Sequence, residues 1–169
     1  MKKFLLIALL LVSGSVAFAQ QAAGDFQLQA QGSYFNNSFN GLSVSSGSLF
    51  VSASRFFTDN VELGIAPFFL FGDFSSTNLS IFGNYSFLTQ DAKLVPYAGA
   101  QLLFTGLGTD PDFSQTGFGI KAGLRYFVRE NINIDVGPSM SFMSAPTGAS
   151  EGSTQFVFNF GLGYILKKQ

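Results

Sequence analysis

The stretch that decides the fold runs from residue 156 to residue 166 and reads FVFNFGLGYIL. Its bulky apolar side chains fall on every second residue from Phe156 to Leu166, while Asn159, Gly161 and Gly163 take alternate positions. A period of two is typical of a β-strand whose two faces meet different surroundings. Residues 156–166 therefore predict a strand with one apolar face and one polar or small face.

The same alternation recurs along the chain, clearly in residues 26–34, 118–126 and 132–142. Four noisier strands of similar length are expected at 48–57, 61–71, 77–88 and 93–104. A tilted strand needs about 9–11 residues to cross a bilayer, which these segments approach. Together they predict eight strands. The facing of 48–57 stays open, because Ser52 and Ser54 on one face and Arg55 on the other all suit a polar interior.

Short and mostly longer connections alternate between these strands. The short ones lie at 58–60, 89–92 and 128–131, and the others, rich in Ser, Gly, Asp and Pro, lie at 36–47, 72–76, 105–115 and 143–152. Outer-membrane barrels have short periplasmic turns and longer external loops. An even strand number then places both termini in the periplasm. Prolines at 67, 96 and 138 predict local β-bulges, because proline lacks a ladder donor.

The composition is unusual for a water-soluble domain. Charged residues make up 11% of the chain, there are 22 Phe, and no segment after Val12 is apolar for long enough to form a transmembrane helix. A chain that faces lipid without helices must pair its backbone between strands and close the sheet. The expected fold is all-β: an eight-stranded antiparallel up-and-down transmembrane β-barrel.

The first residues have the features of an export signal. Lys2 and Lys3 precede the apolar run 4–12, and Ala17-Phe18-Ala19 supplies a cleavage pattern. We expect residues 1–19 to be a cleaved signal peptide and residues 20–169 to form the barrel domain. The mature chain then carries seven basic and ten acidic residues with no basic stripe, so nucleic-acid binding is not expected.

Several motifs carry a family resemblance. They are Arg-Phe-Phe-Thr-Asp-Asn at 55–60, Leu-Val-Pro-Tyr-Ala-Gly-Ala at 94–100 and Gly-Leu-Gly-Tyr at 161–164. With the signal peptide, they resemble the small eight-stranded outer-membrane barrels of the OmpA-transmembrane, OmpX and OmpW kind, and most of all the outer membrane β-barrel domain proteins of Bacteroidetes. The resemblance implies a cell outer-membrane location, with membrane lipids and the outer-membrane assembly machinery as partners. Such barrels usually end on an aromatic residue, whereas three polar residues follow Leu166 here, which leaves Tyr164 as the substitute.

Five charged residues are candidates for the barrel interior. Alternation directs Glu62, Lys121, Arg125 and Asp135 inward, and Arg55 joins them because the segment after it echoes the segment after Arg125. These charges could line an ion-selective pore or could pair and plug the lumen. The interior of an eight-stranded barrel is only wide enough for its side chains to fill, which favours the plug.

Aromatic residues near the strand ends predict two interfacial girdles, which such barrels carry at both membrane faces. The residues are Phe57, Phe87, Tyr126 and Tyr164 near the short turns, and Tyr34, Phe71 and Phe142 near the loops.

The sequence contains no histidine and no cysteine, so it excludes a Ser-His-Asp triad and any His- or Cys-based metal site. We expect no catalytic, cofactor-binding or metal-binding residue. The first functional hypothesis is a non-enzymatic, monomeric barrel with a plugged lumen and a structural or surface-interaction role. The alternative is a narrow pore or transporter for small or apolar solutes. A soluble lipocalin-like barrel is disfavoured, because the non-apolar face is rich in Gln, Ser, Asn and Gly.

Overall fold

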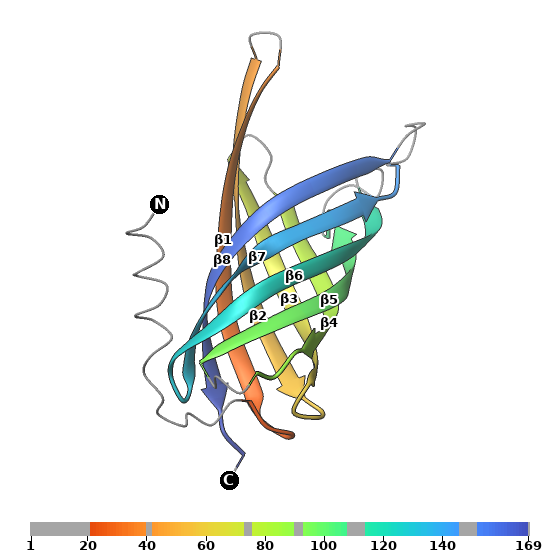
Figure 1. Cartoon of the computed structure of the whole chain (residues 1–169). Coiled ribbons are helices and arrows are strands. Elements are labelled where there is room, and N and C mark those ends of the chain that lie inside the picture. The colour runs from red at the N-terminus through yellow and green to blue at the C-terminus, as the bar shows by residue number, and fades with distance from the viewer. Residues whose placement is uncertain are drawn as a thin grey trace, which may run out of the picture.

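The computed structural model describes residues 21–39, 42–72, 76–89, 93–107, 114–145 and 152–168. Its eight strands are β1 (Phe26–Phe39), β2 (Leu42–Phe56), β3 (Val61–Gly72), β4 (Ser76–Ser86), β5 (Leu94–Thr105), β6 (Gln115–Arg129), β7 (Ile132–Met143) and β8 (Ser153–Leu166). Each strand is antiparallel to its neighbours, and β8 pairs with β1, so the sheet closes into a barrel in chain order (Figure 1). The prediction of an eight-stranded antiparallel barrel is confirmed.

Alternation along each strand sorts side chains between the two faces of the barrel wall. Large apolar side chains such as Leu63, Ile65 and Phe158 are exposed on the outside, while Gln27 and Asn133 are fully buried inside. This is the reverse of a water-soluble protein, whose outer face is polar. In the described ranges no helix is long and apolar enough to cross a membrane. The expected signal peptide, residues 1–19, lies outside the described residues.

The first hairpin is longer than the sequence indicated. Residues 36–47 were expected to form a loop, but β1 and β2 stay paired up to Phe39 and Leu42. In Figure 1 this two-stranded ribbon rises beyond the other strands. Polar residues do not end a ladder whose backbone groups are satisfied by the neighbouring strand, so the Ser- and Asn-rich composition was a poor guide to the turn.

The bulges expected at the three prolines were wrong. The pairs on either side of Pro67 and Pro138 keep one register, and Pro96 pairs directly with Leu124. In an antiparallel ladder a residue directs its N–H to one neighbouring strand only, so proline removes pairing on one side and leaves the other. Pro67 accordingly still pairs with Leu79, and Pro138 with Phe158. The one register shift in the described ladders lies instead between Phe127 and Arg129.

Asp25 ties the two ends of the described chain together beneath the barrel. Its carboxylate accepts hydrogen bonds from the backbone N of Lys168 at 3.0 Å and of Ala22 at 3.0 Å, and from Nζ of Lys167 at 3.1 Å. Burial by itself would raise the pKa of Asp25, but these hydrogen bonds and the Lys167 charge outweigh it and lower the pKa. The residues before β1 and after β8 thus lie at the same end as the short turns after β2 and β6 (Figure 1).

Candidate functional site in the barrel lumen

A cluster of buried charges crosses the lumen between β3, β6 and β7. Nη2 of Arg125 lies 3.0 Å from Oε2 of Glu62, and Nε of Arg125 lies 3.6 Å from Oδ2 of Asp135. Arg125 and Asp135 are direct neighbours across β6 and β7, whereas Glu62 reaches Arg125 from the opposite wall. All three side chains are about 1% exposed. The sequence identified all three, and the structure brings them together.

Neutral side chains donate hydrogen bonds to both carboxylates. Glu62 accepts hydrogen bonds from the hydroxyl of Ser54 and, at 2.9 Å, from Nδ2 of Asn84. Asp135 accepts hydrogen bonds from the Tyr97 hydroxyl at 2.7 Å and from Nε2 of Gln31 at 3.2 Å. Among the described residues Oδ2 of Asp135 and Nε and Nη1 of Arg125 make no hydrogen bond, so opposite charge holds this side of the cluster together.

Aromatic rings pack on the Arg125 guanidinium. Its Cζ lies 5.6 Å from the centroid of Phe56 and 5.4 Å from that of Tyr97. Tyr97 needs the space opposite it, because a Cβ on Gly123 would lie 2.6 Å from the Tyr97 hydroxyl. The sequence missed Tyr97 as a member of the site, since its partners come from strands far apart in the chain.

Lys121 faces the same lumen but stands apart from the cluster. Its Nζ lies 3.8 Å from the centroid of the Phe82 ring, a cation–π contact, and the side chain is only half-buried. With Lys121, the described interior of the barrel contains two cations and two carboxylates.

Arg55 does not join the cluster, and the expectation that it faces inward was wrong. Ser54 and Phe56 point into the barrel, so Arg55 between them is exposed outside, with its Cζ 6.0 Å from the Phe57 ring. The β6–β7 hairpin has one more residue between Arg125 and Asn131 than the β2–β3 hairpin has between Arg55 and Asn60. The register shift between Phe127 and Arg129 accommodates this extra residue. One extra residue moves a strand's side chains to the other face, which turns Arg125 inward while Arg55 points outward.

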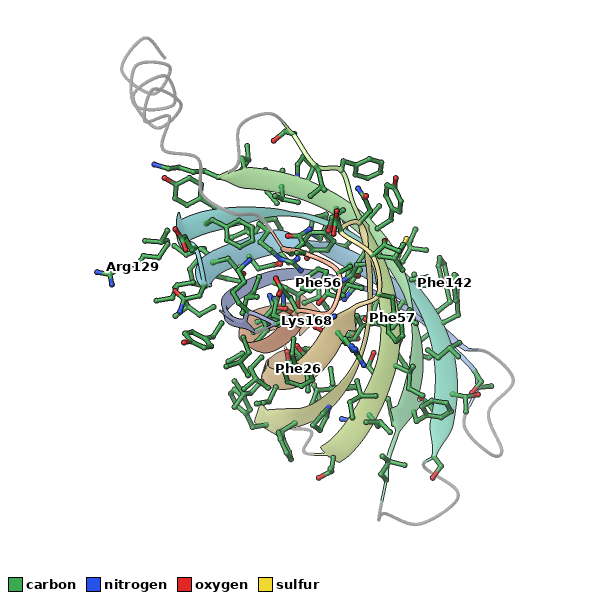
Figure 2. All side chains as sticks on the ribbon, turned by 90° about the horizontal axis from the view of Figure 1, so that it is seen from below. Phe26, Phe56, Phe57, Arg129, Phe142 and Lys168 are labelled. Atoms are coloured by element: carbon green, nitrogen blue, oxygen red, sulfur yellow. The ribbon has the colours of Figure 1, made fainter. Side chains whose placement is uncertain are left out.

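A buried apolar cluster, the apolar floor, lies next to the charged cluster at the end of the barrel with the short turns. Phe56, Val95, Phe127 and Ile165 form one buried cluster at the strand ends next to the short turns, each at most 1% exposed. Figure 2, viewed from this end, shows Phe56 among the side chains in the middle of the barrel and Arg129 outside it. The sequence analysis missed this floor. Its signal was a pair of adjacent apolar residues, such as Phe56-Phe57 and Tyr126-Phe127, where alternation should have placed a polar one.

The predicted girdle residues lie on the outer face wherever their side chains are described. Phe57, Phe87 and Tyr164 are exposed near the short turns, Phe71 and Phe142 are exposed near the other end, and Tyr126 is half-buried on the outer face. The Tyr34 side chain lies outside the described part of the structure.

No metal-binding group of three or more Asp, Glu, His or Cys residues occurs among the described residues.

No protein-family model and no curated protein sequence matches the chain. Solved structures do match. The N-terminal β-barrel domain of Pseudomonas aeruginosa OprF superposes with a TM-score of 0.63 at 24% identity, covering 86% of this chain and 100% of that one. Neisserial surface protein A gives 0.67 at 19% identity, covering 83% and 98%, and outer membrane protein H of P. aeruginosa gives 0.64 at 17%, covering 85% and 100%. The chain has the fold of the small eight-stranded outer-membrane β-barrels.

Proposed function

We propose that this protein is a non-enzymatic outer-membrane β-barrel with a closed, non-conducting lumen, and that it acts structurally or through the end that carries the first hairpin. One observation carries the proposal: the buried Glu62–Arg125–Asp135 cluster joins β3 to β6 and β7 across the lumen and lies against the apolar floor. An ion crossing the barrel would have to break a buried ion network and then pass fully buried apolar side chains.

The outer surface supports the membrane location. Apolar side chains are exposed along every strand, and exposed apolar surface of this extent marks contact with lipid or with partners. The exposed apolar side chains form an apolar belt around the barrel, and the aromatic side chains at its two ends suit the two membrane interfaces. Outer-membrane lipids, and the assembly machinery during biogenesis, are the partners that follow from this location.

Single-channel conductance of the purified protein in planar bilayers tests the closed lumen. We expect no steady channels from the wild type. Removing the positive charge with Arg125→Ala should lower stability without producing a defined conductance, and the exposed Arg55→Ala is the matched control. Steady wild-type channels whose conductance changes with Arg125→Ala but not with Arg55→Ala would instead make the protein a narrow pore.

Labelling of intact cells tests the orientation. The chain has no cysteine, so single cysteines report without background. With the short turns in the periplasm, a membrane-impermeant thiol reagent should label Ser38→Cys in the first hairpin and leave Arg129→Cys at the opposite end unlabelled. The reverse pattern would overturn the proposed orientation.

A further inference from the structure

The seam between β1 and β8 is paired along only half its length. The ladder runs from Phe26 opposite Leu166 to Gly32 opposite Phe160 and stops there. Both strands continue, β1 to Phe39 and β8 back to Ser153, and these two described segments are not paired with each other. Figure 1 shows β1 and β2 rising away from β8 at this end.

Each segment is fully paired on its other side. Residues 33–39 pair with β2, from Ser33 opposite Ser48 to Phe39 opposite Leu42. Residues 153–159 pair with β7. In an antiparallel sheet, alternate residues direct both their N–H and C=O groups to the same neighbour, so about half of the residues in each segment direct their backbone groups to the open side.

The two open edges match one another. Continuing the register from Gly32 and Phe160 would place Ser33 opposite Asn159 and Phe39 opposite Ser153. The edges are therefore antiparallel, equal in length and end together. Exposed edges are commonly protected by charged residues or proline, yet residues 26–54 and 152–166 contain neither.

The open β8 edge borders the apolar belt. Phe156 and Phe158 on this edge are the most exposed large apolar side chains of the described chain, at 70% and 62%. Next to hydrocarbon, open backbone groups lack water to bond with. An occupant of this edge must therefore offer backbone groups of its own.

We propose that a second copy of this chain occupies the seam. Two barrels related by a twofold axis along the membrane normal would face each other seam to seam. Residues 33–39 of each would then pair with residues 153–159 of the other. Both ladders are antiparallel, both barrels insert the same way up, and the assembly closes at two copies. A single foreign strand could be antiparallel to only one of the two edges, because β1 and β8 run in opposite directions.

This dimer replaces the monomer expected from the sequence. The dimer goes beyond the closed lumen proposed above, and the two proposals can fail separately. A monomer could also have a closed lumen, and a dimer could still conduct ions.

Cysteine cross-linking tests the pairing. Ser38 and Thr154 stand opposite each other in the continued register, so cysteines at these two positions would come within reach of a disulfide if the strands pair. Differently tagged Ser38→Cys and Thr154→Cys copies, co-expressed and oxidised in membranes, should give a cross-linked species that carries both tags. Thr77→Cys, exposed on β4 away from the seam, replaces Ser38→Cys in the control and should give none.

A chain carrying both Ser38→Cys and Thr154→Cys separates the alternatives. Oxidation to a monomer with an internal disulfide, without exchange between tags, would show that the seam zips within one chain and would overturn the proposal. Wild-type mass in mild detergent is a readout that needs no variant: twice the chain mass is expected, and a monomer without cross-linking also overturns the proposal. Gel mobility before and after heating establishes that each variant has folded.

Discussion

Replacing Arg125 with methionine tests the energetic account of the lumen. Arg125→Met keeps much of the length and volume of the side chain but removes the one cation within ion-pair distance of Glu62 and Asp135 among the described residues. Both carboxylates remain buried, and breaking a buried ion pair in this way costs about 3–5 kcal/mol. We expect the free energy of unfolding to fall by that amount.

Arg55→Met is the matched control, because Arg55 lies outside and its one ion, ring or hydrogen-bond contact to the described residues is with the Phe57 ring. An exposed cation–π contact contributes about 0.5–1 kcal/mol, so this variant should stay close to the wild type. Urea titration in detergent, followed by far-ultraviolet circular dichroism and gel mobility, suits a chain without tryptophan. Equal unfolding midpoints for the two arginine variants would refute the reasoning. The double variant Glu62→Gln, Arg125→Met should be destabilised by less than the sum of its single variants, because the two residues are coupled.

Three further predictions concern other parts of the barrel. Asp25→Asn should lower stability by about 1–3 kcal/mol at neutral pH. Folding lowers the pKa of Asp25, so its contribution to the free energy of unfolding is present above about pH 3.9 and is lost as the pH falls through the folded pKa. A difference in urea midpoint between the wild type and Asp25→Asn that persisted into strong acid would contradict this account. Phe127→Ala should cost about 3–5 kcal/mol by opening a cavity in the floor, whereas the outward-facing Phe118→Ala should cost clearly less in the same titration. Gly137→Ala would press a Cβ onto the backbone of β6 and should cost about 1–3 kcal/mol, while Gly32→Ala, whose Cβ would meet its nearest atom at 3.7 Å, should unfold close to the wild type.

The strand number and closure could be predicted because alternation and lipid exposure act locally, residue by residue. Strand ends were harder. The Ser- and Asn-rich segment 36–47 has turn composition, yet most of it belongs to the first hairpin ladder. Prolines at 67 and 138 were expected to cause bulges, but each removes pairing on one side only.

The candidate site was predictable where alternation alone decides facing, as for Glu62, Arg125 and Asp135. Arg55 was misplaced because a single extra residue near the β6–β7 turn changes the phase between two similar hairpins. Tyr97 and Gln31, which complete the Asp135 environment, depend on which strands meet across the lumen. Which strands face each other depends on how the barrel closes, and no local sequence pattern indicates it.

The central claim is that the lumen is closed. Thiol accessibility along the lumen tests it most directly, because it locates the point at which water and small solutes stop. Ser139 lies on the hairpin side of Asp135 along β7 and is partly exposed, whereas Asn133 lies on the short-turn side of Asp135, opposite the floor residue Phe127, and is fully buried. With the protein in lipid vesicles, a small hydrophilic thiol reagent present on both sides should modify Ser139→Cys and should leave Asn133→Cys unmodified until the barrel unfolds. Modification of both cysteines at similar rates would mean that water and small solutes pass the cluster, and would contradict a closed lumen.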